Sequence, residues 1–77
     1  MADKSILKKV AKFLESEKNP ADETKIVVRK DDVQIYPSDS GVIYGYILKA
    51  VYIVAEFYHL DYYVSTEQDG TIYLQIY

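Results

Sequence analysis

The residues whose types and spacing come closest to catalytic chemistry are His59 and Asp61, which could form half of an acid–base pair. Such a pair works in acyl transfer only beside a nucleophile and a donor for the oxyanion. The sequence has no G-x-S-x-G turn and no glycine-rich nest to supply them. A histidine at a helix end is more often a favourable end charge. We therefore expect no enzymatic activity.

Adjacent carboxylates occur at Asp22-Glu23 and Asp31-Asp32, without the further ligands at loop spacing that a calcium site needs. With zero cysteines and one histidine, cysteine-based and histidine-cluster zinc sites are excluded. The spacing of Gly41 and Gly45 matches no phosphate-binding motif. We expect turn and cap roles for the acidic pairs, and no metal or cofactor.

Charge is distributed unevenly along the chain. Residues 1–18 carry five lysines against three acids, a balance of +2, whereas residues 19–77 carry nine acids against four basic residues, a balance of −5. Four of the lysines are expected to project together from one helix, and they are Lys4, Lys8, Lys9 and Lys12. This lysine face is either a solvated surface or a patch that contacts phosphates.

Tyrosine is unusually frequent, with nine copies in 77 residues. We expect Tyr44, Tyr58 and Tyr62 to pack in the core. Tyr63, Tyr73 and Tyr77 are expected to form an outward row on a sheet. Tyrosine is enriched at protein interfaces, and exposed aromatic residues can also stack on bases. The strand motif of RNA-recognition modules is absent. A protein interface, ordinary packing and nucleic-acid contact all remain open.

The elements that must position these residues begin with an amphipathic helix over residues 4–18, ended by Asn19-Pro20. The β-branched runs 24–30 and 33–36 predict a hairpin about Asp31-Asp32. A two-residue turn there would place Val28 opposite Ile35. The buried face would then hold Ile26, Val28, Val33 and Ile35.

Residues 41–59 are rich in strand-forming Val, Ile and Tyr, yet residues 46–59 contain no turn-forming residue. We therefore predict a helix, N-capped by the loop over residues 37–41. The polar stripe of this helix is narrow, and most of its circumference is apolar, which is more than packing on one sheet face requires. The helix is therefore expected either to be central to the fold or to pack also against a second subunit. A homodimer through this helix is possible. Lys49 at mid-segment and the short apolar run argue against a membrane span.

Residues 60–66 and 71–77 predict a second hairpin, with Gly70 in the left-handed position of its turn. In this register Tyr62, Val64, Ile72, Leu74 and Ile76 face inward. Tyr63, Ser65, Tyr73, Gln75 and Tyr77 face outward.

The order α-β-β-α-β-β predicts one α+β domain over residues 1–77: a four-stranded antiparallel sheet with two helices packed on one face. This topology gathers acidic residues at the two ends of the sheet, roughly 20 Å apart. One end holds Asp31, Asp32 and Asp61. The other holds Asp22, Glu23, Asp39, Glu67 and Asp69.

These features predict a cytoplasmic, non-enzymatic interaction module that docks through its acidic ends and tyrosines on a basic, nucleic-acid-binding protein. In length, acidity, lack of cysteine and tyrosine content the chain resembles small phage or mobile-element proteins that disable host factors, a resemblance of composition that covers no motif. The alternative is a single-stranded nucleic-acid (RNA) binder that uses the lysine face and the sheet tyrosines.

Overall fold

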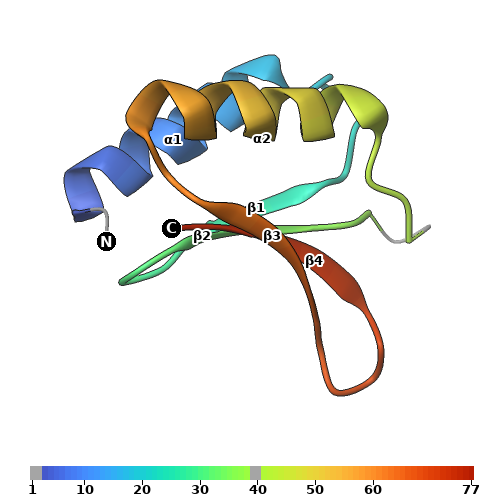
Figure 1. Ribbon diagram of the computed structural model, residues 1–77. Helices are drawn as coiled ribbons and strands as arrows, with labels where there is room; N and C mark the ends of the chain where they lie inside the picture. The colour runs from blue at the N-terminus through green and yellow to red at the C-terminus, as the bar shows by residue number, and fades with distance from the viewer. Residues whose placement is uncertain (1–2, 39–40) are drawn as a thin grey trace.

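A computed structural model describes residues 3–38 and 41–77 as two helices packed on one side of a four-stranded antiparallel sheet (Figure 1). The expected α+β order is confirmed. Neighbouring strands follow the order β1-β2-β4-β3, so that β1 and β3 are the edges. The elements are α1 (Lys4–Glu17), β1 (Lys25–Val28), β2 (Val33–Tyr36), α2 (Gly45–Tyr58), β3 (Tyr62–Thr66) and β4 (Ile72–Ile76).

Helix α1 begins at a capped N-terminus and lies with its apolar side on the sheet. The carboxylate of Asp3 accepts a hydrogen bond from the backbone N–H of Ile6 at 2.9 Å, which satisfies one of the free donors of the first turn. The buried side of the helix consists of Leu7, Val10, Ala11 and Leu14. The 3.6-residue spacing of these side chains is therefore what fixes the orientation of α1.

The β1–β2 hairpin has the expected faces but a different register. Val28 lies opposite Val33, and Ile26 lies opposite Ile35, so the prediction that Val28 faces Ile35 was wrong. The loop is four residues long and is closed by a 2.8 Å hydrogen bond from the N–H of Arg29 to the C=O of Asp32. The favoured two-residue hairpin turns need positive φ angles, and among the described non-glycine residues only His59 has one. Because the shift is two residues, no side chain changes face.

The tyrosine-rich segment after the first hairpin is helical, as expected, but α2 begins at Gly45 and not at residue 41. Tyr44 is the N-cap residue and makes no side-chain cap hydrogen bond, so the expected cap from the loop over residues 37–41 is wrong. Gly41 has a φ of +80°, which a right-handed helix cannot contain. At the other end His59 adopts φ 57° and its N–H reaches the last carbonyls, so this residue ends the helix.

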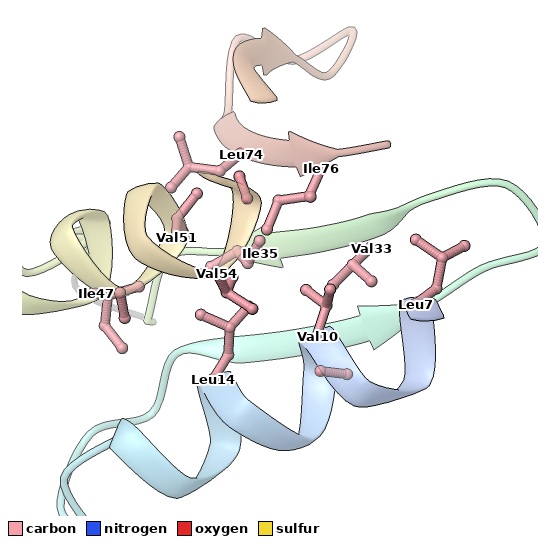
Figure 2. Close-up of a cluster of buried hydrophobic side chains, with 13 residues drawn as sticks. Leu7, Val10, Leu14, Val33, Ile35, Ile47, Val51, Val54, Leu74 and Ile76 are labelled. Atoms are coloured by element: carbon pink, nitrogen blue, oxygen red, sulfur yellow. The ribbon is translucent and has the colours of Figure 1, made fainter. Parts of the chain in front are cut away.

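The core lies between the two helices and the inward side chains of β2 and β4 (Figure 2). Leu7 and Leu14 of α1 and Ile47 of α2 are fully buried against the central strands. Val33 and Ile35 of β2 and Ile76 of β4 are fully buried too, and Leu74 is nearly so. The two central strands therefore carry most of the apolar contact between sheet and helices.

The helices cover the sheet unevenly, because the β3–β4 turn projects away from them (Figure 1). Tyr62, Val64 and Ile72 point to the helix side, as the register predicts, yet each remains more than two-fifths exposed. Tyr44 is also exposed, so of the three tyrosines expected in the core only Tyr58 is partly buried. Over the described part of the chain, neither helix has the length and apolarity that crossing a bilayer requires.

Candidate functional site

The sheet surface opposite the helices, here called the open face, carries a polar and aromatic set of side chains. Strand alternation turns every second residue to this side, and the register aligns Val27, Gln34, Gln75 and Tyr63 in one row across the four strands. A second row contains Tyr36 and Tyr73, whose rings stack with centroids 5.0 Å apart. The predicted outward row of Tyr63, Tyr73 and Tyr77 thus lies on the open face.

A hydrogen-bonded network surrounds Asp32 at one end of the open face. One carboxylate oxygen of Asp32, Oδ2, accepts hydrogen bonds from the side-chain amides of Gln75 and Gln34. Gln34 is buried, and its Oε1 accepts hydrogen bonds from the hydroxyl of Tyr36 and from the guanidinium of Arg29. The network therefore holds one side of the Asp32 carboxylate in a fixed position.

The other carboxylate oxygen of Asp32, Oδ1, is buried and accepts no hydrogen bond from residues 3–38 and 41–77. The nearest cationic atom is Nε of Arg29, which is 3.9 Å away on a side chain that is 59% exposed. A buried polar atom without a partner costs free energy, on the order of 1–3 kcal/mol. Because this oxygen has almost no exposed surface, a donor from outside could reach it only if neighbouring side chains, such as the exposed Arg29, moved aside.

Asp32 lies in a shallow depression of about 400 Å³, here called the acid–tyrosine depression, lined by Asp31, Asp32, Tyr63, Gln75 and Tyr77. The rings of Tyr63 and Tyr77 meet edge to face, with centroids 5.3 Å apart and an interplanar angle of 83°. Two carboxylates beside two aromatic rings match the requirements of a guanidinium or ammonium group. Four of the predicted partner-binding residues are therefore brought together here.

The remaining predicted acids are distributed as the topology implies, with one residue outside the described ranges. The C=O of Asp61 accepts a 2.9 Å hydrogen bond from the N–H of Tyr77, which places Asp61 at the same end as the depression, although it does not line it. Glu67 and Asp69 lie at the opposite end. Asp39 lies outside the described residues.

The opposite end has a second acidic depression, of about 550 Å³, whose lining includes Tyr36, Glu67 and Asp69. Burial raises the pKa of Tyr36, and the neighbouring carboxylate of Glu67 raises it further. The carboxylate of Asp69 accepts a 2.9 Å hydrogen bond from the N–H of Thr71 in the hairpin turn. Interactions with Thr71 hold the pKa of Asp69 below its ordinary value. The carboxylate of Asp69 therefore already has a structural role as a hydrogen-bond acceptor within the turn.

The lysine face lies on the other side of the molecule. Lys4, Lys8, Lys9 and Lys12 are all exposed on α1, whose opposite side packs on the sheet. The tyrosine row lies on the face of the sheet that α1 does not cover. The two features that the nucleic-acid alternative combines are therefore separated by the thickness of the domain.

The acidic pair Asp22-Glu23 includes a structural residue. The buried carboxylate of Asp22 accepts hydrogen bonds from the N–H and the hydroxyl of Thr24, at 2.8 and 2.6 Å, and from the hydroxyl of Tyr46 in α2. The Tyr46 hydroxyl also accepts a 2.9 Å hydrogen bond from the N–H of Asn19. This cluster ties the connection between α1 and β1 to α2, and so it belongs to the fold.

Two residues of the acid–tyrosine depression and its network, Gln34 and Gln75, had no predicted role in binding. The predicted register had placed Gln75 on the outward side, and strand alternation puts Gln34 on the side opposite the predicted buried residues Val33 and Ile35. Their pairing across β2 and β4 follows from the strand order, in which β4 inserts between β2 and β3. Among residues 3–38 and 41–77, no three His, Asp or Glu side chains gather closely enough to hold a metal ion.

Comparison with known proteins adds no identity: the chain matches no protein-family model, no curated protein and no solved structure.

Proposed function

We propose that this protein is a non-enzymatic interaction module whose open face holds basic side chains of a partner protein. The observation that carries the proposal is the acid–tyrosine depression, in which Asp31 and Asp32 lie beside the rings of Tyr63 and Tyr77. The bound group would be an arginine or a lysine side chain.

Arginine fits the acid–tyrosine depression better than lysine. Its planar guanidinium can donate to Asp32 and Asp31 while its face lies against Tyr63 or Tyr77. A charge-assisted hydrogen bond contributes about 1.5–3 kcal/mol, and a cation–π contact contributes about 0.5–2 kcal/mol. One such side chain would therefore act as a central contact of a larger interface.

The second acidic depression suggests the shape of the partner surface. Tyr36, Glu67 and Asp69 lie at the other end of the open face, so an extended basic surface could contact both depressions at once. Proteins that bind nucleic acid present such surfaces. We propose that class as the partner, and an inhibitory mode of action in which the module occupies the basic surface. The compositional resemblance to small phage and mobile-element proteins supports this mode.

The test is affinity capture from the native host with charge-reversal variants. Asp31→Lys places a cation in the depression at an exposed position and should abolish capture of the partner. Glu56→Lys is the matched control, because it changes the net charge equally at an exposed position on α2, on the other side of the sheet. Capture that survives Asp31→Lys, or that is lost equally in Glu56→Lys, would reject the proposal.

A gel-shift assay with mixed RNA and DNA at low salt tests the nucleic-acid alternative in the same preparation. The proposal predicts no retardation. Retardation that is lost in Lys8→Glu/Lys12→Glu would assign the activity to the lysine face instead.

A further inference from the structure

The two edge strands of the sheet differ in how they are protected from pairing with another chain. Edge strands in monomeric proteins are protected by charged residues, proline, bulges or a covering element. Strand β1 begins with Lys25 and packs under α1. Strand β3 has the sequence Tyr62-Tyr63-Val64-Ser65-Thr66, in which every residue except Ser65 is a good strand former and none is charged. The edge at β3 is therefore open to pairing.

The backbone groups on this free edge can be identified from the hydrogen bonds to β4. The C=O of Asp61 and the N–H of Glu67 bond to Tyr77 and Thr71 across the hairpin. Hydrogen-bonded and non-hydrogen-bonded pairs alternate along an antiparallel ladder, so the odd-numbered residues of β3 bond to β4. The N–H and C=O groups of Tyr62, Val64 and Thr66 therefore point away from the sheet.

An exposed apolar surface, here called the edge patch, lies on the helix side of this edge. It consists of Leu48 and Tyr52 of α2, Tyr62 and Val64 of β3, and Ile72 of β4, which are between 42% and 60% exposed. The rings of Tyr52 and Tyr62 meet edge to face at 6.2 Å, so the helix and strand parts are continuous. The edge patch and the free backbone groups lie along the same edge, so one chain bound there would contact both.

We propose that the β3 edge pairs with β3 of a second copy of this chain, forming a continuous eight-stranded sheet across a two-fold axis. A second copy fits this edge because antiparallel pairing of two β3 strands places the two-fold axis perpendicular to the sheet. The helices of both subunits then lie on the same side of the joined sheet. Leu48 and Tyr52 of one subunit then face the same residues of the other. A single extended peptide would satisfy the backbone groups but leave Leu48 and Tyr52 exposed.

The area available fits a small stable dimer. The exposed parts of the edge patch amount to on the order of 500 Å² per subunit, since a single aromatic side chain can contribute 150–250 Å². With the strand backbone and the flanks of Tyr63 and Ser65, the contact would bury on the order of 1,200 Å² in total, the lower end of specific interfaces. The edge patch is thus large enough for self-association.

The register of the pairing follows from parity and charge. In an antiparallel pair, residues directly opposite each other point to the same side of the sheet. Two opposite residues of the joined β3 strands must therefore both have even numbers or both have odd numbers, so the two-fold axis passes through a residue and not between two residues. An axis at Val64 would place Asp61 opposite the partner's Glu67, which is a repulsive pair. An axis at Tyr63 instead places Tyr62 opposite the partner's Val64, and this is the register that we infer.

This dimer goes beyond the proposed docking function, and the two surfaces share Tyr63, which lines the acid–tyrosine depression and lies on the two-fold axis. The acid–tyrosine depression lies on the open face, whereas the edge patch lies on the helix side. Two depressions would face the same direction on one joined sheet. A failure of self-association would leave docking by a single chain unaffected, and a failure of docking would leave the dimer unaffected.

The test is the mass of the whole chain in solution, by light scattering at high micromolar concentration. Wild type should show about twice the 8.9 kDa chain mass. Val64→Lys should return the mass to that of one chain, because it places like charges at the joined edge. Val27→Lys is the matched control on the opposite edge strand, where Val27 is 41% exposed, and it should leave the dimer unchanged.

Amide hydrogen exchange provides the second measurement, and it keeps the proposal testable if Val64→Lys fails to fold. In wild type the N–H groups of Tyr62 and Val64 should become protected as concentration rises, whereas Tyr63 and Ser65 should be protected at every concentration. A monomeric wild type would overturn the proposal. So would a dimer that survives a folded Val64→Lys variant, or that is lost in Phe57→Lys on the other flank of α2.

Discussion

The cluster of Asp22 and Tyr46 gives the sharpest test of how the helices are held. Tyr46→Phe removes one hydroxyl that donates to the Asp22 carboxylate and accepts from the N–H of Asn19. A hydrogen bond to a charged group contributes about 1.5–3 kcal/mol. Because Tyr46 is 40% exposed, water can replace part of the loss, and we expect about 1.5 kcal/mol.

Thermal unfolding followed by circular dichroism measures this loss. For a domain of this length, about 1.5 kcal/mol lowers the midpoint by roughly 6–12 °C. The matched control is Tyr44→Phe, which removes the hydroxyl of an exposed tyrosine whose ring stacks on Tyr46 at 6.2 Å. This control should shift stability by less than about 0.5 kcal/mol.

The pH dependence has a defined sign. Burial raises the pKa of the Asp22 carboxyl, but hydrogen bonds from Thr24 and Tyr46 and the charge of Lys18 outweigh it, so the pKa lies below its ordinary value of 3.8. Folding therefore favours the carboxylate. The contribution of the Asp22 carboxylate to the free energy of unfolding is complete above the pKa that this group has in the unfolded chain. It is lost as pH falls through the lower pKa that the group has in the folded chain.

The difference between wild type and Tyr46→Phe should accordingly be largest near neutral pH and shrink below pH 3.8. Equal midpoints for Tyr46→Phe and Tyr44→Phe at neutral pH would refute the role given to the hydroxyl. A difference that stays constant down to the acid transition would refute the role of the Asp22 charge.

Three further variants test the fold. Ile35→Ala empties a fully buried position at the centre of the core and should cost about 2–5 kcal/mol in urea unfolding. Asp3→Ala removes the cap of α1 and should cost about 1 kcal/mol in the same assay, with no change at Lys9→Ala on the exposed side. His59→Gly should raise stability by about 0.5–1 kcal/mol, because φ 57° strains any residue with a Cβ; an unchanged or lower midpoint would contradict that reason.

The sequence alone was enough to predict the order of elements and the side of the sheet on which each strand residue lies. The helical spacing of apolar residues predicted α1. The lack of turn residues between positions 46 and 59 predicted α2, although Val, Ile and Tyr in that segment favour strands. Both follow from local patterns. The start of α2 was missed because neither Gly41 at positive φ nor a Tyr44 N-cap without a side-chain bond leaves a capping signal.

The candidate site was predicted only in part, because it depends on which strands are neighbours. The ends of the sheet that hold Asp31 and Glu67 follow from topology alone. The insertion of β4 between β2 and β3 brings Gln75 beside Gln34 and Asp32, and no local pattern specifies that order. The exposure of Val64 was missed for a similar reason, since alternation assigns a face but does not say whether a helix covers it.

The central claim is that the open face recognises a basic side chain through Asp32. It is tested most directly by titrating the isotopically labelled protein with a short arginine-containing peptide and following amide and side-chain NMR signals. We predict that the largest shifts occur at Asp31, Tyr63, Tyr77 and the side-chain NH₂ of Gln75. Shifts that gather on α1 or α2, or no shifts at peptide concentrations well above that of the protein, would contradict the account.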